Sequence, residues 1–336
     1  MSLISVVVPV YFNSASLAPL LERLQAMAAA NSADRFEFVF VDDGSGDDSF
    51  EVLMRLAQVE SRIRIVKLSR NFGAQDALYA GMQHARGDAV AVIAADLQDP
   101  PELLSTLVER WRAGSKVVLA IREGRNDPWL TQALARAFHV VYRRLAHATL
   151  PRGSVGFFLV DRQVCDLLNR IEENNTWIVG LLLWSGFEPA LVPYERGGRA
   201  PHFGISKWSF GKRFKLFIDS IVGYSYVPLR IASSLGIVLS FVGLAYAVVI
   251  IATSVMRHSQ PEGWTSLMVV VLVVSGVQLL MIGVVGEYVW RALDAARARP
   301  RFVVDRVVEP SHSQSEEVFL PVSRAGRGQK AADPRK

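Results

Sequence analysis

The sequence has little of what disulfide-stabilised or zinc-binding proteins need. Its 336 residues include one cysteine, Cys165, so no disulfide can form within the chain. Four of the histidines are not spaced as the ligands of a shared metal ion would be; these are His84, His139, His147 and His202. A P-loop segment is missing. Residues 1–10 lack the basic start and cleavage site of a signal peptide, so we predict none.

Charged residues are absent from two long segments, 231–256 and 264–286. Each exceeds the roughly 20 residues that a helix needs to cross a ~30 Å hydrocarbon core, so we expect two transmembrane helices. Seven Lys and Arg residues lie between positions 196 and 230, and five Arg residues lie between 291 and 306. The only basic residues of the connecting loop are Arg257 and His258. The positive-inside rule then predicts a multi-pass protein of the cytoplasmic membrane with both termini in the cytoplasm.

Apolar runs alternate with helical patterns through roughly the first 125 residues. The runs, which we expect to be strands, cover 4–10, 36–41, 63–68, 89–95 and 117–121, and the expected helices cover 17–30, 49–60, 75–85 and 101–113. Strands that alternate with helices predict an α/β fold with a Rossmann-like, mostly parallel sheet. Such sheets bind ligands at the carboxyl ends of their strands.

The remaining segments have other patterns. Residues 131–149 predict a basic helix, and 157–160 predict a short edge strand. Residues 207–230 mix basic and aromatic side chains, which predicts an amphipathic helix and linker at the membrane interface, with an ordinary surface helix as the alternative. Few apolar residues occur in 308–336, which we expect to be a disordered cytoplasmic tail. A globular unit over 1–206 precedes these C-terminal parts.

Polar clusters follow three of the expected strands. They are Asp42-Asp43-Gly44-Ser45, Ser69-Arg70-Asn71 and Asp96-Leu97-Gln98-Asp99. Because parallel strands end at the same edge of a sheet, these clusters are candidates for one ligand site, although the first also suits a simple turn. Asp96 and Asp99 suit a hard divalent cation held between protein and diphosphate. Asp99 equally suits the N-cap of the helix that follows.

Four segments occur in order at sensible spacings: Val8-Pro9-Val10-Tyr11, Val41-Asp42-Asp43-Gly44-Ser45, Leu68-Ser69-Arg70-Asn71-Phe72-Gly73 and Asp96-Leu97-Gln98-Asp99-Pro100-Pro101-Glu102. With the expected interface helix and two spans, the sequence resembles the family-2 glycosyltransferases of GT-A fold along nearly its whole length. The similarity is to the polyprenyl-phosphate branch, which includes dolichol-phosphate mannose synthase and the bactoprenol glucosyltransferases.

The resemblance implies an inverting, metal-dependent enzyme. Its donor would be a nucleotide-diphospho-sugar, with uridine as the first-choice base and guanosine as the second. Its acceptor would be a polyprenyl phosphate, undecaprenyl phosphate if the source is bacterial, and its cofactor would be Mg²⁺ or Mn²⁺. Relatives also suggest a homo-oligomer packed through the membrane helices. The sugar itself is not identified by the sequence.

The resemblance also assigns roles to individual positions. Pro9, Tyr11, Asp42, Asp43 and Arg70 would contact the nucleotide; Asp96 and Gln98 would serve the metal; Asp96, Arg122 and Arg136 would form the catalytic set; and Arg136 and Lys207 would meet the acceptor phosphate. Arginine suits such a role because its planar fork pairs bidentately with phosphate.

Two positions depart from the family pattern. Ala94 stands where many relatives have an acidic residue, and the segment around Gly156 lacks an aspartate that relatives carry. The alternative function is therefore a catalytically weakened, membrane-tethered protein that binds a nucleotide-sugar. A processive polysaccharide synthase fits the sequence less well, because the sequence lacks the Q-x-x-R-W segment and the additional spans of that class. The net charge of +5 does not indicate a nucleic-acid partner, because basic residues flank the expected spans.

Overall fold

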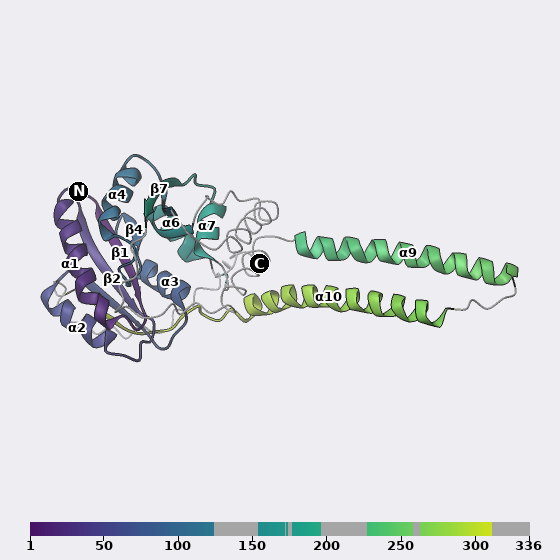
Figure 1. Ribbon diagram of the computed structural model, residues 1–336. Coiled ribbons are helices and arrows are strands. Elements are labelled where there is room, and N and C mark those ends of the chain that lie inside the picture. The colour runs from purple at the N-terminus through teal and green to yellow at the C-terminus, as the bar shows by residue number, and fades with distance from the viewer. Residues whose placement is uncertain (124–153, 172, 174–176, 196–226, 258–262, 311–336) are drawn as a thin grey trace, which may run out of the picture.

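The computed structural model describes residues 1–123, 154–171, 173, 177–195, 227–257 and 263–310. An α/β domain lies at one end of the molecule, and two long helices project from it (Figure 1). The predicted basic helix over 131–149 and nearly all of the predicted interface segment 207–230 lie outside the described residues. Arg136 and Lys207 lie outside them as well.

Within the described residues, eight strands form one sheet in the order β7-β5-β6-β4-β1-β2-β3-β8. The strands are β1 (Leu3–Val10), β2 (Arg35–Asp42), β3 (Ile63–Leu68), β4 (Ala89–Val92), β5 (Val117–Glu123), β6 (Ser154–Asp161), β7 (Ala190–Glu195) and β8 (Val304–Val308). The strands β4, β1, β2 and β3 run parallel to one another, as do β5 and β7. The predicted α/β fold with a mostly parallel sheet is confirmed.

Helices cover both faces of the sheet, because side chains alternate between the faces of a strand. In β1, Val6 and Val8 pack with residues of α1, α2 and α4, whereas Val7 packs with residues of α3, α6 and α7 on the opposite face. The helices are α1 (Ser14–Ala30), α2 (Ser49–Val59), α3 (Ala74–His84), the 3-10 turn η1 (Pro101–Leu103), α4 (Leu104–Arg112), α6 (Arg162–Arg170) and α7 (Ile178–Trp184). Burial of each such valine or leucine contributes about 1.5–3 kcal/mol, so the uninterrupted apolar run of β1 stabilises both cores.

The strand predicted over 157–160 is not an edge strand. It belongs to β6, which lies between β4 and β5 and runs antiparallel to both. Its four apolar residues are at most 3% exposed, as is typical of a strand covered on both faces. The edge-strand prediction was wrong because the chain returns after β5 and inserts β6 between two earlier strands.

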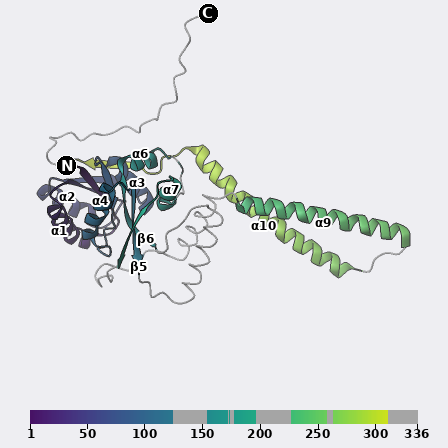
Figure 2. The ribbon, with the colours of Figure 1, turned by 90° about the horizontal axis from the view of Figure 1, so that it is seen from above.

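Two long helices, α9 (Val227–Arg257) and α10 (Trp264–Arg297), pack against each other and extend away from the domain (Figures 1 and 2). They contain the predicted spans 231–256 and 264–286, and α10 continues beyond the second of these. Large apolar side chains on both helices are exposed, among them Phe241, Tyr246, Leu279 and Ile282. Exposed apolar surface of this extent indicates contact with an apolar environment.

By length and composition, one stretch in the described part of the chain, Val273–Arg297, is sufficiently long and apolar to cross a membrane. A shorter apolar helical stretch covers Ala232–Gly243 in α9. The predicted pair of transmembrane helices is therefore supported for α10 and stays a prediction for α9.

After α10 the chain returns to the domain and forms β8, which pairs antiparallel with β3 at the edge of the sheet. The N–H of Ser69 donates to the carbonyl of Val303 at 3.0 Å, just before this strand. The predicted disordered tail began at residue 308, yet Val308 belongs to β8 and Glu309 is ion-paired. That boundary was wrong because a five-residue strand containing aspartate and arginine shows little apolar pattern. The rest of the predicted tail, 311–336, lies outside the described residues.

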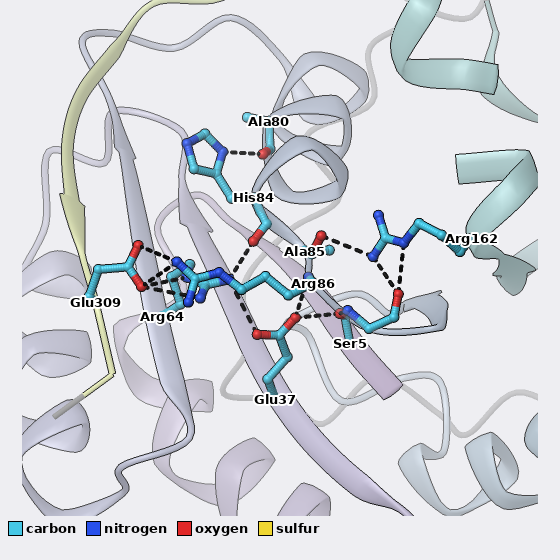
Figure 3. Close-up of polar contacts among 10 residues, drawn as sticks. Ser5, Glu37, Arg64, Ala80, His84, Ala85, Arg86, Arg162 and Glu309 are labelled. Carbon is cyan, nitrogen blue, oxygen red and sulfur yellow. Dashed lines mark hydrogen bonds and ion pairs between the residues drawn. The ribbon is translucent and has the colours of Figure 1, made fainter. Parts of the chain in front are cut away.

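Glu309 connects β8 to a buried charged cluster at the amino-terminal edge of the parallel strands (Figure 3). Its carboxylate lies 3.1 Å from Nη2 of Arg64 and 3.2 Å from Nη2 of Arg86. The Arg64 side chain, which is 2% exposed, also pairs with Glu37 at 3.2 Å. Glu37 further accepts the hydroxyl of Ser5 and the backbone N–H of Arg86, each at 2.5 Å. Each buried charge here has a partner, and buried charges are tolerated under that condition.

Candidate functional site

The polar loops predicted to form one site lie at the same edge of the sheet. The parallel strands β4, β1, β2 and β3 end there, and the loops that follow them carry the polar clusters. Backbone hydrogen bonds join these strand ends: the N–H of Asp43 donates to the carbonyl of Val10 at 2.9 Å, and the N–H of Ile93 donates to that of Val7 at 3.0 Å. This is the edge at which such sheets bind ligands.

Asp43 holds the loop after β3 against the end of β2. Its carboxylate accepts the N–H of Phe72 at 2.7 Å and the N–H of Gly73 at 2.9 Å. Burial raises the pKa of the Asp43 carboxyl, although these two hydrogen bonds oppose the rise. Asp43 thus shapes the site by fixing the segment that carries Arg70.

Asp42 combines a turn with an unused acceptor. Its Oδ1 accepts the N–H of Ser45 at 3.2 Å, as in an Asx turn, so the turn alternative describes part of its role. Its Oδ2 is buried and has no hydrogen-bond partner among the residues that the structure describes. Burial also raises the pKa of the Asp42 carboxyl. A buried acceptor without a partner is costly, and a ligand N–H or hydroxyl would satisfy it.

Aromatic and guanidinium surfaces flank these acids. Tyr11 meets the ring of Phe12 edge-on at 4.7 Å between centroids, and Pro9 lies one residue before the end of β1. Phe12 has a φ of 57°, a left-handed conformation that residues other than glycine seldom adopt. Arg70 is exposed and stacks on the ring of Phe72 at 4.0 Å. Flat surfaces of this kind suit the stacking of a nucleoside base.

The loop after β4 holds Asp96 against Gln98. Nε2 of Gln98 donates to Oδ2 of Asp96 at 2.8 Å, and the backbone N–H of Gln98 lies 3.3 Å from Oδ1. Leu97, between them, has a left-handed φ of 56°, a strain that often marks functional sites. Within the described ranges, no group of three or more His, Cys, Asp or Glu side chains could hold a metal. Mg²⁺ does not need one, because it keeps several waters and binds through one or two carboxylates and substrate phosphates, so Asp96 fits it.

Asp99 does not cap the helix that follows it. The 3-10 turn η1 has Pro100 at its N-cap and no side-chain cap bond. The buried Asp99 carboxylate instead accepts the hydroxyl of Tyr194 at 2.6 Å through Oδ1. Nη2 of Arg122, near the end of β5, lies 3.8 Å from the same oxygen. The capping alternative was wrong because Asp99 points towards β5 and β7, and Tyr194 escaped sequence reasoning because one tyrosine in an alternating strand is not distinctive.

The two departures from the family pattern have different settings. Ala94 is half-buried in the loop after β4, and its side chain carries no ligand atom. At Gly156 in β6, a Cβ atom would lie 1.7 Å from the hydroxyl oxygen of Tyr194. Only glycine therefore fits at position 156 while Tyr194 keeps its place.

Comparison with known families agrees with this architecture. Residues 5–169 match the family described as Glycosyl transferase family 2, and residues 227–291 match the one described as GtrB C-terminal hairpin. The first match covers the sheet from β1 to β6, and the second covers α9 and most of α10.

Individual relatives extend the match along the chain. The chain is 37% identical over 303 residues to the uncharacterized glycosyltransferase YkcC of Bacillus subtilis, covering 90% of this chain and 93% of that protein. It is 36% identical to the uncharacterized glycosyltransferase sll0501 of Synechocystis, covering 90% and 94%. It is 33% identical to the bactoprenol glucosyl transferase of Shigella phage SfV, covering 90% and 97%. The chain therefore belongs to glycosyl transferase family 2, in the polyprenyl-phosphate branch that contains the bactoprenol glucosyl transferases.

Proposed function

We propose that this protein is an inverting glycosyltransferase that moves a sugar from a nucleotide-diphospho-sugar to a polyprenyl phosphate at the cytoplasmic face of the membrane. A UDP-sugar is the proposed donor, and undecaprenyl phosphate is the proposed acceptor. The observation that carries the proposal is the convergence of Asp42, Asp43 and Asp96 at one strand edge of a chain with exposed apolar helices. The relative that is a bactoprenol glucosyl transferase supports the same class of acceptor.

In this proposal the nucleotide lies across the ends of β1, β2 and β3. The buried Oδ2 of Asp42 is an acceptor for a uracil N–H or a ribose hydroxyl. Pro9 and Tyr11 line the nucleoside pocket, and Arg70 contacts the nucleotide from the loop that Asp43 holds in place.

Asp96 is the proposed ligand for Mg²⁺ or Mn²⁺. Gln98 binds Asp96 through Nε2 and so orients the carboxylate, which makes Oε1 of Gln98 the atom that would serve as a second ligand. The bound ion would supply charge stabilisation on the departing diphosphate. Ala94 has no side-chain oxygen, so waters and the diphosphate would have to complete the coordination.

The acceptor explains why the site needs no strong general base. A phosphate monoester has a second pKa near ~6, so its oxygen is already ionised at neutral pH. The task of the protein is then to align the two substrates and to stabilise charge on the leaving group. Arg122 is proposed to grip a phosphate, as are Arg136 and Lys207 outside the described residues.

The proposed membrane arrangement has α9 and α10 as two spans with both termini in the cytoplasm. Just past the predicted span 264–286, Glu287 of α10 pairs with Arg291 at 3.2 Å, so these two charges compensate each other. The catalytic domain then lies on the cytoplasmic side. A homo-oligomer packed through these helices stays a prediction.

The test of this function uses the full-length protein in detergent with Mg²⁺, undecaprenyl phosphate and a panel of radiolabelled nucleotide-sugars. We expect label from one donor to enter the lipid phase, which would also identify the sugar and the base. Omission of the lipid or addition of a chelator is the control, and either should abolish the transfer. Transfer from no donor, together with intact nucleotide binding, would favour the alternative in which Ala94 and Gly156 mark a binding protein with weakened chemistry.

Gly44→Ala is expected to weaken nucleotide binding and to lower stability by about 1–3 kcal/mol. Gly44 has a φ of +64°, and a Cβ atom there would lie 2.5 Å from the carbonyl carbon of Arg70. Since backbone must move to relieve this overlap, the ends of β2 and β3 would separate. Affinity for UDP measured by calorimetry and the melting temperature in detergent report the two effects.

Gly114→Ala is the matched control. Gly114 also has a positive φ, +104°, but a Cβ atom there would meet nothing within 4 Å among the described residues. It should lower stability through backbone strain alone and leave the affinity for UDP unchanged. Equal losses of affinity in both variants would contradict the role given to the contact between Gly44 and Arg70.

A further inference from the structure

Tyr194 lies beside Arg122 and shares a contact with it through Asp99. The two residues are register partners in the parallel strands β7 and β5. The Tyr194 ring is buried and packs edge-on against Phe157, with centroids 5.4 Å apart. Its hydroxyl donates to Oδ1 of Asp99 at 2.6 Å. Burial, followed by the neighbouring Asp99 carboxylate, raises the pKa of the Tyr194 hydroxyl well above its usual range, so it stays a donor at physiological pH.

Asp99 links this hydroxyl to the guanidinium group. Its side chain is 2% exposed, and Oδ1 lies 2.6 Å from the tyrosine oxygen and 3.8 Å from Nη2 of Arg122. The Arg122 side chain is 17% exposed, so part of it can still reach a ligand. Nε of Arg122 is buried and has no hydrogen-bond partner in the part of the chain that the structure describes. Asp99 therefore lies against one side of the guanidinium group as an ion-pair partner, and the exposed part of the group can still bind an anion.

The cluster is attached to the loop of the proposed metal ligand. Asp99 follows Asp96 by three residues, and Leu97 between them adopts a left-handed conformation. A displacement of Asp99 would therefore move both Arg122 and the loop that contains Asp96. This places Arg122 at the end of the site where the diphosphate would bind the metal.

We propose that Tyr194 is a positioning residue that, through Asp99, holds Arg122 in place to grip the donor diphosphate. This inference rests on the proposed function, because that function brings a diphosphate to the Asp96 loop. It also accounts for Gly156, since a side chain there would displace the Tyr194 hydroxyl. A purely structural role for Tyr194 would instead affect stability without affecting phosphate recognition.

The variant Tyr194→Phe tests the inference, because it removes the hydroxyl and keeps the ring that packs on Phe157. The full-length protein in detergent with Mg²⁺ is titrated with UDP and, separately, with uridine; GDP and guanosine serve if guanine is the base. We expect the affinity for UDP to fall about tenfold, as when a hydrogen bond to a charged group is lost, while the affinity for uridine is unchanged. An unchanged ratio of the two affinities in the folded variant would overturn the inference.

Trp111→Phe is the matched control. Nε1 of Trp111 donates to the Asp161 carboxylate at 2.8 Å, a bond of similar kind at the opposite end of β6. Its loss should lower the melting temperature and leave the ratio of UDP to uridine affinity as in the unaltered protein. A tenfold change in that ratio for Trp111→Phe as well would show a general loss of stability and would count against Tyr194 as a positioning residue.

A double-mutant cycle with Gly156→Ala adds a second test. The alanine Cβ would lie 1.7 Å from the Tyr194 hydroxyl oxygen, which Tyr194→Phe removes, and 2.8 Å from Cζ, so the phenylalanine ring of the double variant needs only a small shift. We expect Gly156→Ala alone to lower UDP affinity about as much as Tyr194→Phe, and the double variant to lose no more than either single variant. Additive losses would contradict the shared mechanism. If Gly156→Ala does not fold, the affinity ratio of Tyr194→Phe decides alone.

The same measurements separate this inference from the proposed function. If the unaltered protein binds UDP more tightly than uridine but transfers no sugar to lipid, the proposed function fails, and the response of the ratio to Tyr194→Phe still decides the inference. If neither UDP nor GDP binds more tightly than its nucleoside, Arg122 does not grip a diphosphate and both ideas fail. If transfer occurs and Tyr194→Phe leaves the ratio unchanged, only the inference fails.

Discussion

Replacement of Asp96 with asparagine is expected to lower the rate of sugar transfer by on the order of 10²–10³-fold. Asparagine keeps the shape of the side chain, and its oxygen can still accept the side-chain amide of Gln98, so the variant loses only the longer 3.3 Å contact with the backbone N–H of Gln98. It removes the negative charge that is proposed to hold the metal against the departing diphosphate. Turnover as a function of Mg²⁺ concentration, and Mn²⁺ binding in the presence of UDP, measure the effect.

The control for this variant is Asp166→Asn. Asp166 lies on α6, its side chain is 50% exposed, and it pairs with Arg162 at 3.5 Å, away from the strand ends that form the site. Its loss should leave both turnover and Mn²⁺ binding unchanged. Full turnover of Asp96→Asn at saturating Mg²⁺ would contradict the proposed metal role and would direct attention to the other residues of that loop.

Among the variants proposed for this protein, Arg64→Met is expected to lower the free energy of unfolding most, by about 3–5 kcal/mol. The variant keeps an unbranched side chain that fills the aliphatic part of the site, but it leaves the carboxylate of Glu37, whose side chain is 10% exposed, without its cation. Glu309 also loses a partner, although it is 34% exposed and keeps its contact with Arg86. A melting temperature lower by about 10 °C in detergent is the corresponding result.

Arg23→Met is the matched control for the buried cluster. Arg23 forms a two-pronged pair with Glu102 at 2.9 and 2.7 Å, and the two side chains are 39% and 57% exposed. An exposed pair of this kind contributes no more than about 1 kcal/mol, so the variant should melt close to the unaltered protein. Similar losses in both variants would mean that burial does not set the importance of the Arg64 cluster.

The parts of the fold that could be predicted from sequence are the strands in which nearly every side chain is buried, because such strands appear as unbroken apolar runs. The strands β1, β2 and β3 are covered on both faces, so their apolar runs mark them within a residue or so of their observed ends. The neighbouring polar clusters could be assigned to one edge because parallel strands all end there. That reasoning brought together the segments that contain Asp42, Arg70 and Asp96.

The parts that could not be predicted depend on contacts between distant segments. The place of β6 is set by pairing with β4 and β5, which a local pattern does not encode. The bond between Tyr194 and Asp99 joins positions 95 residues apart, and the pairing of β7 with β5 brings Tyr194 to this end of the sheet. In β8, five residues gain their stability from β3 and from the buried Arg64, so their own sequence gives little indication of a strand.

The short connection between α10 and β8 also bears on how far the proposed lipid acceptor would have to move to reach the site. Residues 298–303 separate the end of α10 from β8, and six residues can span at most about 20 Å. The strand enters beside Leu68, at the carboxyl end of β3, and runs towards Ile65. In the proposed arrangement with α10 in the membrane, this short connection would hold the carboxyl ends of the parallel strands close to the bilayer. An acceptor could then present its phosphate while its hydrocarbon tail remains among the lipids, so that the reaction needs no extraction of the lipid.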